Sequence, residues 1–344
     1  MTQALRALAL VLAFVAALVA RANAAQPPAE FFAGKTVSIL IGFGPGGAND
    51  IWARTIAKHI GNHIPGRPRV VPQNAPGAGG LKLMNQLYNL SPKDGTVIGL
   101  VNRGIPLEPL LGGEGTQFDP LKMNWIGSPD RDTTVCVARK DARVQTMDDL
   151  LTKELLVGAT GSGADTAIYP EFLATLLGMK FKTVKGYQGT KEISLAMERG
   201  EVDGICVAYD SLNRETLARE GKINILFQAS LVPDPRLKNI PVGTDLARSE
   251  ADRQALRLFF VRAGLGRPFV APPGVPAERV AILRDAFADT MKDPEFLRDA
   301  KLQELNVDVL SGEALAEMLA SVYRTPKDVV ARTAKAMSRS GRGR

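Results

Sequence analysis

The hydrophobic pattern of residues 31–101 alternates between short apolar runs and helical stripes. Residues 36–41 form a β-branched, apolar run, which predicts a buried strand. Ile51, Ile56 and Ile60 then recur near helical spacing. The order of strand, glycine-rich break and helix returns once more before a strand-like run at 96–101. Strands that alternate with helices in this way favour an α/β domain with a parallel sheet.

The second half of the chain repeats this order. Strand-like runs at 133–138, 155–158, 181–184 and 202–209 are separated by helical stripes. A third glycine-rich loop joins the second of these runs to a helix. At 344 residues the chain is long enough for two domains with separate cores. We therefore expect two α/β halves, with a ligand site in the cleft between them.

Glycine-rich loops stand where three predicted strands lead into helices. The first, at 42–50, would direct backbone N–H groups and the positive end of a helix into one crevice, which is a general anion site. Gly42, Gly44 and Gly47 match the spacing of the dinucleotide fingerprint, but no acidic residue follows the next strand-like run. A tight turn without a ligand remains an alternative. A small anion such as a carboxylate is favoured, because loops at 74–80 and 159–166 are of the same kind.

The two ends of the chain differ from its body. Residues 1–25 combine Arg6, an uncharged run and a small-residue cleavage site, which predicts a secretory signal peptide and a periplasmic protein. Much of the net charge of +7 lies in this leader and in the last ten residues. We therefore interpret 326–344 as a basic, frayed C-terminal tail. The body is nearly neutral and has no basic patch interleaved with aromatic residues, so nucleic-acid binding is not expected.

The residues that could support catalysis or bind a metal are few. Cys136 and Cys206 lie in strand-like runs and could form a disulfide in an oxidising compartment, or remain as two buried thiols. His59 and His63 are the only histidines, and no glutamate of a metalloprotease motif accompanies them. Ser162 does not lie in a nucleophile elbow. We therefore expect no metal, no cofactor and no enzyme, with a hydrolase as the disfavoured alternative.

Several segments together resemble a known family. They read I-G-F-G-P-G-G-A-N-D, N-A-P-G-A-G-G, S-P-K-D-G-T-V-I-G, G-A-T-G-S-G-A-D-T, G-Y-Q-G-T-K-E, E-R-G-E-V-D-G and F-V-A-P-P-G-V-P-A-E-R. In this order they resemble the Bug (TctC-like) family of periplasmic solute-binding proteins of tripartite tricarboxylate transporters, over about residues 31–319. The resemblance implies a two-lobed, type II Venus-flytrap fold, each lobe a mostly parallel sheet flanked by helices. We assign 26–130 and 256–325 to lobe 1, and 131–255 to lobe 2.

The resemblance also implies a function and a site. A monomer would capture a small organic carboxylate by closing its lobes, with water bridging the carboxylate to the first two loops, and would deliver it to membrane permease subunits. A ligand-sensing partner of a membrane receptor would have the same fold and is the alternative. The candidate ligand-binding residues are Phe43, Gly46, Gly47, Ala48, Asn49, Gly77, Ala78, Gly79, Arg103, Arg131, Thr160, Gly161, Ser162, Gly163, Asp165, Thr166, Tyr187 and Asp210.

Some of these candidates have specific roles. The hydroxyls of Thr160, Ser162 and Thr166 could donate to a carboxylate, and either Arg103 or Arg131 could add a bidentate partner or lie on the surface. Asp210 could bind a ligand hydroxyl or amine, or cap the end of its strand. The stretch around Tyr187 and the strand that ends at Asp210 depart from the family pattern, which leaves the ligand's identity open.

Overall fold

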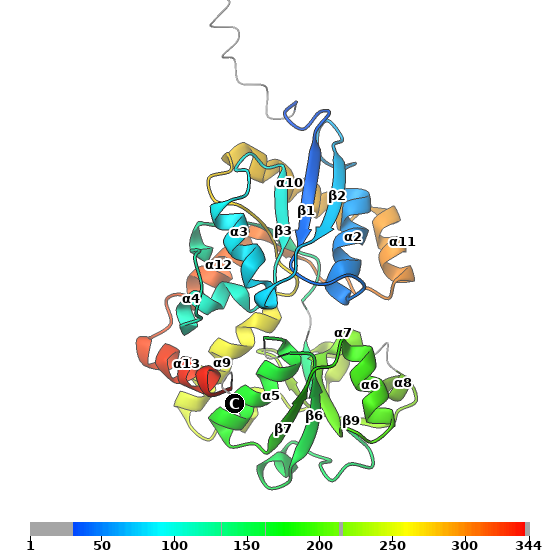
Figure 1. Cartoon of the computed structure of the whole chain (residues 1–344), viewed down its shortest axis with the longest axis vertical. Coiled ribbons are helices and arrows are strands. Elements are labelled where there is room, and N and C mark those ends of the chain that lie inside the picture. Colours follow the sequence, from blue (N-terminus) through cyan, green and yellow to red (C-terminus); the bar gives the residue numbers. More distant parts are fainter. Residues whose placement is uncertain (1–29, 132, 162, 213–215, 341–344) are drawn as a thin grey trace, which may run out of the picture.

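A computed structural model describes residues 30–131, 133–161, 163–212 and 216–340, in two lobes (Figure 1). The predicted signal peptide, 1–25, lies outside the described residues. Lobe 1 contains a six-stranded sheet in the order β11-β4-β10-β3-β1-β2. Its strands are β1 (Thr36–Ile41), β2 (Arg69–Asn74), β3 (Val97–Leu100), β4 (Asn124–Ser128), β10 (Phe269–Ala271) and β11 (Leu310–Ser311).

Helices cover both faces of this sheet. They are α2 (Ala48–Ile60), α3 (Leu81–Asn89), α4 (Glu108–Leu111), α10 (Ala277–Thr290), α11 (Pro294–Leu302) and α12 (Gly312–Val322). The alternation along β1 divides its side chains between two clusters: Ile39 and Ile41 pack with α2, α10 and α11, whereas Leu40 packs with α3 and α12. Both faces are therefore buried, which explains the nearly continuous apolar run.

Lobe 2 contains a five-stranded sheet in the order β7-β6-β8-β5-β9. Its strands are β5 (Thr134–Arg139), β6 (Leu155–Ala159), β7 (Phe181–Lys185), β8 (Gly204–Ala208) and β9 (Ile223–Ala229). α5 (Asp165–Leu177) and α9 (Glu250–Gly264) cover one face, and α6 (Thr190–Glu198), α7 (Tyr209–Leu212) and α8 (Thr216–Arg219) cover the other.

Both sheets are mixed rather than mostly parallel. β1 pairs in parallel with β2 and β3, and β6 with β7 and β8, as the strand–helix alternation predicts. β10 is antiparallel to both of its neighbours, and β5 is antiparallel to β8 and β9. β5 and β10 each enter their sheet directly from a segment by which the chain crosses between the lobes, and not through a helix on the sheet's own face.

The predicted lobe boundary at residue 255 falls inside α9. Phe259 and Phe260 of this helix pack with Tyr169 and Phe172 of α5, in the core of lobe 2. Leu258 joins the cluster of lobe 1 instead. α9 therefore belongs mainly to lobe 2 but touches both lobes.

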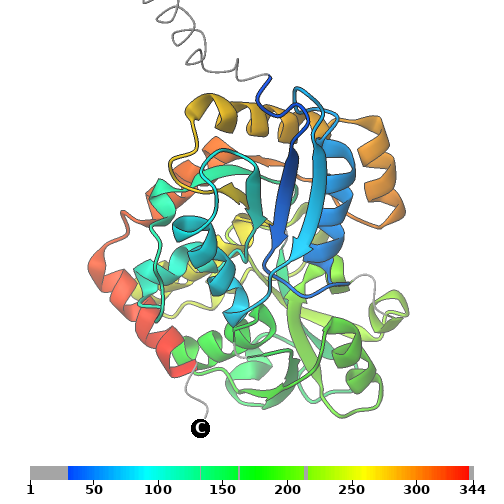
Figure 2. The same cartoon turned by 45° about the horizontal axis from the view of Figure 1, so that its top comes forward.

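The expected frayed tail is instead a packed helix, α13 (Lys327–Ser340). Val329 is buried in a lobe 1 cluster, and Ala336 in a lobe 2 cluster. Figure 2 shows α13 running along the side of the molecule toward lobe 2. The prediction was wrong because small buried residues mark the packed face of this helix, while its basic residues dominate the composition.

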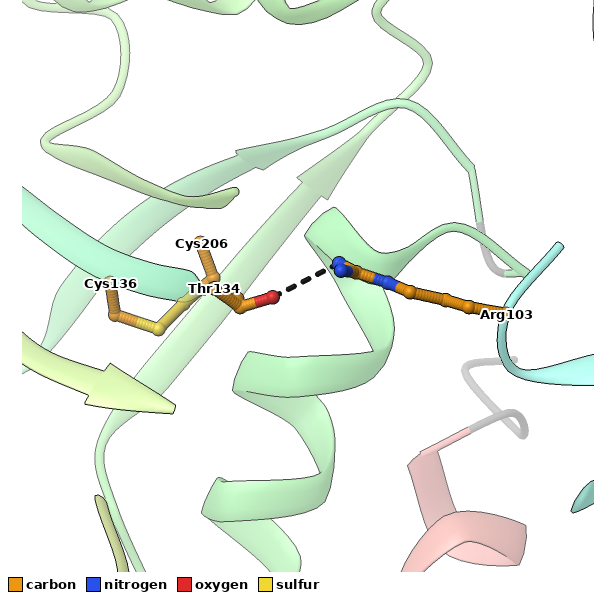
Figure 3. The surroundings of a disulfide bond; sticks show 4 residues. All are labelled: Arg103, Thr134, Cys136 and Cys206. Carbon is orange, nitrogen blue, oxygen red and sulfur yellow. Dashed lines mark hydrogen bonds between the residues drawn. A yellow bond between two sulfur atoms is a disulfide. The ribbon is translucent and has the colours of Figure 1, made fainter. Parts of the chain in front are cut away.

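Cys136 and Cys206 form a disulfide within the sheet of lobe 2 (Figure 3). The two residues are direct partners in the antiparallel register of β5 and β8, and both are fully buried. Their side chains lie on the sheet face that α5 and α9 cover. The sequence left open whether the two cysteines form a disulfide or remain as buried thiols, and the structure shows the disulfide.

Candidate ligand-binding cleft

Two adjoining cavities lie between the lobes. The first, which we call the inner compartment, has a volume of about 270 Å³. Seven of the predicted site residues line it: Phe43, Ala48, Asn49, Arg103, Thr160, Asp165 and Thr166. The sequence did not single out Asn102, Ala164, Thr190, Val207, Ala208, Ser211, Gly266 and Arg267, which complete the lining. The inner compartment thus draws on both lobes and on the segment that joins α9 to β10.

The second cavity, the outer compartment, has a volume of about 660 Å³. Ala48, Thr190 and Ser211 line both compartments, so the two meet at these residues. The rest of its lining consists of Pro45, Gly46, Gly47 and Ile51 from lobe 1, and Gln188, Gly189, Lys191, Glu192 and Leu195 from lobe 2. Gly46 and Gly47 of the predicted site therefore lie in the outer compartment.

The third glycine-rich loop presents the start of α5 to the inner compartment. Thr166 ties the loop together, because its hydroxyl accepts a hydrogen bond from the Thr160 N–H at 3.1 Å and lies 3.3 Å from the Thr160 hydroxyl. Ala164 is the N-cap residue and supplies no side-chain cap. The start of this 13-residue helix therefore opens into the cavity beside two hydroxyls, with Asp165 in its first turn.

Arg103 and Asp165 join the lobes across the inner compartment. Arg103 Nη2 lies 2.6 Å from Asp165 Oδ2 and donates to the Thr134 hydroxyl at 3.0 Å (Figure 3). Burial alone would raise the pKa of Asp165, but the positive charges of Arg103 and Arg262 hold that pKa below its usual value. Asp165 is therefore ionised and neutralises much of the Arg103 charge.

Arg267 is the positive group that sequence reasoning missed. It is nearly buried, forms an ion pair with Asp130, and lines the inner compartment. Burial, together with the like charge of Arg103, lowers the pKa of Arg267 to about 9, so the guanidinium remains charged at neutral pH. Arg267 lies in a proline-rich stretch whose composition predicts a stiff connector, and no motif in that stretch indicates a binding role.

Acidic side chains lie in the first turns of both helices that start at the outer compartment, Asp50 in α2 and Glu192 in α6. Asp50 Oδ2 accepts a hydrogen bond from the Gly46 N–H at 2.9 Å, and Glu192 accepts one from the Gln188 N–H. Burial would raise the pKa of Asp50, but hydrogen bonds from Arg54, Gly46 and Asn74 outweigh it and lower that pKa. The first loop therefore carries an anion of its own chain, Asp50.

Three predicted site residues lie elsewhere in the described structure. Arg131 forms a bidentate ion pair with Asp308, with Nη2 2.6 Å from Oδ1, and borders a separate cavity of about 630 Å³. Asp210 forms an ion pair with Arg236. Tyr187 packs against the apolar cluster under α6. These contacts occupy the charges of Arg131 and Asp210, so the structure does not bring either of them to the inner compartment.

The second and third loops touch each other across the lobes. Gly77 precedes a 3-10 turn, Ala78–Gly80, and a Cβ added to Gly79 would lie 3.4 Å from the Gly163 carbonyl oxygen. Gly161 precedes Ser162, which lies outside the described residues. Gly79 and Gly163 therefore lie in close contact between the lobes. Neither they nor Gly77 and Ala78 line the inner or the outer compartment.

Solved structures with this architecture were found in the comparison with known proteins. The chain superposes on the periplasmic binding protein BugD with a TM-score of 0.64, at 21% identity, covering 89% of this chain and 98% of that one. It superposes on MatC from Rhodopseudomonas palustris, solved with bound malate, with a TM-score of 0.63, at 20% identity, covering 86% of this chain and 99% of that one. These likenesses and the cleft define a two-lobed periplasmic binding-protein fold.

Sequence comparison identifies the family. Residues 52–325 match the model of the tripartite tricarboxylate transporter family receptor, TctC, and the chain belongs to this family. A relative, the UPF0065 protein in the gbd 5' region of Cupriavidus necator, is 24% identical over 325 residues, which cover 92% of this chain and 93% of the relative. The resemblance stated from the motifs is thus confirmed. The family and the fold are those of a solute-binding protein.

TctC-family proteins are periplasmic binding proteins. In the part of the chain that the structure describes, no helix has the length and apolar character that crossing a membrane requires.

Proposed function

We propose that this protein captures a small organic carboxylate in the inner compartment and delivers it to the membrane subunits of a tripartite tricarboxylate-type transporter. The observation that carries the proposal is the convergence of the charged Arg267, the backbone N–H groups at the start of α5 and the Thr160 and Thr166 hydroxyls on one cavity. Family membership supports a transport role, and malate is the ligand of the related MatC structure. We further propose that the protein acts as a monomer and that export removes residues 1–25.

Closure of the lobes would couple binding to delivery. Arg103 reaches from lobe 1 to Asp165 and Thr134 of lobe 2, so closure pairs these groups while the ligand fills the cavity beside them. A ligand that contacts both lobes stabilises the closed state by its greater affinity for that state. The membrane subunits would then recognise the closed form.

A thermal-shift screen of the exported protein, refolded to remove any retained ligand, would test the carboxylate site. A ligand that binds only the native state stabilises it by about 2.7 kcal/mol at a hundredfold excess over Kd. We expect shifts with organic acids. Arg267→Gln should weaken binding by about 10- to 100-fold, since it removes a charged hydrogen-bond donor from a nearly buried site. Arg298→Gln, the same change on the exposed face of α11, is the control.

The carboxylate proposal fails if neutral or cationic solutes shift the melting temperature and no acid does. It also fails if Arg267→Gln binds acids as tightly as Arg298→Gln.

A further inference from the structure

We infer that the outer compartment holds the apolar tail of the ligand, so that the preferred ligands are monocarboxylates with an extended hydrocarbon or aryl chain. This inference rests on the proposed function, because it takes the carboxylate to lie in the inner compartment. It adds the class of carboxylate and the residues that select it.

The two compartments form a continuous path. Ala48, Thr190 and Ser211 line both, so a chain attached to a carboxylate in the inner compartment can pass between these residues. The inner compartment, at about 270 Å³, suits the anionic head, and the outer one, at about 660 Å³, leaves room for a tail of several carbons.

Apolar side chains line the outer compartment from both lobes. Ile51 of α2 and Pro45 come from lobe 1, and Leu195 of α6 comes from lobe 2. Leu195 is 41% exposed, although leucine gains free energy on burial. A hydrocarbon tail between Ile51 and Leu195 would cover this apolar surface. Each methylene removed from water there should raise the affinity about three- to fourfold.

The charges at the outer compartment disfavour a second carboxylate. Asp50 and Glu192 lie in the first turns of α2 and α6, where their negative charges reduce the attraction of these helix ends for an incoming anion. Lys191 and Glu192 both line the cavity and are both exposed, so water screens them and their charges offset each other. The described lining of the outer compartment therefore offers the second charge of an α,ω-dicarboxylate no net positive charge, whereas an apolar tail can contact Ile51 and Leu195.

The direct test is calorimetry of the refolded protein with linear monocarboxylates from propionate to octanoate, and with dicarboxylates of the same lengths. We expect the affinity for monocarboxylates to rise about three- to fourfold per methylene until the tail fills the compartment. Each dicarboxylate should bind more weakly than the monocarboxylate of equal length.

Two variants connect this length dependence to the outer compartment. Leu195→Gln keeps the side-chain size and removes its apolar character. The matched control is Leu297→Gln on α11, because Leu297 is 40% exposed. Gly189 has an extended backbone (φ −174°), and a Cβ there would meet nothing within 4 Å, so Gly189→Leu can narrow the compartment without strain. Both variants should weaken octanoate binding by about fivefold or more and change propionate binding by less than about twofold.

The outcomes separate this inference from the proposed function. If no acid binds the wild-type protein, the proposed function fails. If short acids bind but affinity does not rise with length, or if dicarboxylates gain more than monocarboxylates, the carboxylate site stands and the apolar assignment is overturned. Unchanged octanoate binding in folded Leu195→Gln and Gly189→Leu also overturns it, and thermal melts of both variants establish that they are folded.

Discussion

At the residue scale, Asp50 determines how the first glycine loop can be used. It accepts hydrogen bonds from the Gly46 N–H at 2.9 Å, from Arg54 at 2.9 Å and from Asn74 at 2.7 Å. The carboxylate thus joins the loop, the first turn of α2 and the end of β2. A loop that would otherwise attract an anion is held in place by an anion of its own chain.

Asp50→Asn should lower the free energy of unfolding by about 1–3 kcal/mol at pH 7, because it weakens charge-assisted hydrogen bonds at a buried site. The folded-state pKa of Asp50 lies below its ordinary value of 3.8, so its contribution is fully present above that value and is lost as pH falls through the folded-state pKa. Urea unfolding of both proteins between pH 7 and pH 3 should show the difference shrinking below about pH 4. A difference that stays constant to pH 3 would contradict this role.

Some of the residues that the sequence singled out line the inner compartment, but the sequence did not indicate which residues they would contact. The third loop was predicted from local features alone, namely a strand, glycines and a helix start, and Thr160 and Thr166 do line the cavity. Arg267 could not be found in this way, because its position depends on α9 returning from lobe 2 to lobe 1. Asp308, which binds Arg131, is 177 residues away in the sequence. Such pairings follow from the packed fold and leave no local pattern.

At the scale of elements, α13 acts as a strap across the two lobes. Val329 packs in a cluster of lobe 1, Ala336 packs in a cluster of lobe 2, and Arg332 forms an ion pair with Asp252 of α9. The stripe that holds it consists of Val329, Thr333 and Ala336. The segment is polar overall but amphipathic, so the spacing of its apolar residues did mark a helix. The prediction of a frayed tail followed the basic composition instead of this spacing.

Truncation after Pro326 should destabilise the protein by more than about 2 kcal/mol, because it exposes the apolar surface of α5 and α9 that α13 covers. The measurement is the midpoint of thermal or urea unfolding. Removal of residues 341–344 alone leaves α13 intact and is the control. If both truncations unfold like the full chain, α13 contributes nothing to stability.

The disulfide joins two adjacent strands and closes a loop with a sequence separation of 70 residues. Replacement of Cys136 and Cys206 by alanine should lower the free energy of unfolding by about 2–4 kcal/mol, since the unfolded chain regains the freedom of that loop. Urea unfolding with and without a reducing agent would measure this. The reducing agent should affect only the wild-type protein, and an equal effect on the double variant would mean that it acts elsewhere.

The alternation of strands and helices was predictable because each parallel strand–loop–helix unit is local in sequence. The antiparallel strands β10 and β11 were not, because each has only two or three residues. Their place in the lobe 1 sheet depends on a return of the chain from lobe 2. Hydrophobic periodicity predicts a helix or strand from the residues of that element alone. It does not indicate which distant strand a predicted strand will pair with.

At the scale of the whole molecule, the chain passes between the lobes three times: between β4 and β5, between α9 and β10, and along α13. Three connections restrict the lobes to rotation about these crossings. Arg103 and Asp165 lie between the lobes, so their ion pair should favour the closed state.

Arg103→Gln and Asp165→Asn should therefore each weaken ligand binding by about 10-fold or more, and the double variant should lose less than the product of the two losses. Calorimetry of the four proteins measures this coupling. Small-angle scattering should show ligand-induced compaction of the wild type and a smaller response in the single variants. Independent effects of the two substitutions would mean that the pair does not contribute to closure.

The central position of β10 in the lobe 1 sheet also orders events during synthesis. β3 and β4 lie on either side of β10, so this sheet has a gap at its middle until residues 269–271 emerge from the ribosome. The whole sheet of lobe 2 has been synthesised by then. The half of the protein that is made first is thus finished last. From the completion of β4 at Ser128 until β10 begins at Phe269, the growing chain carries unpaired β3 and β4 edges that a holding chaperone could recognise.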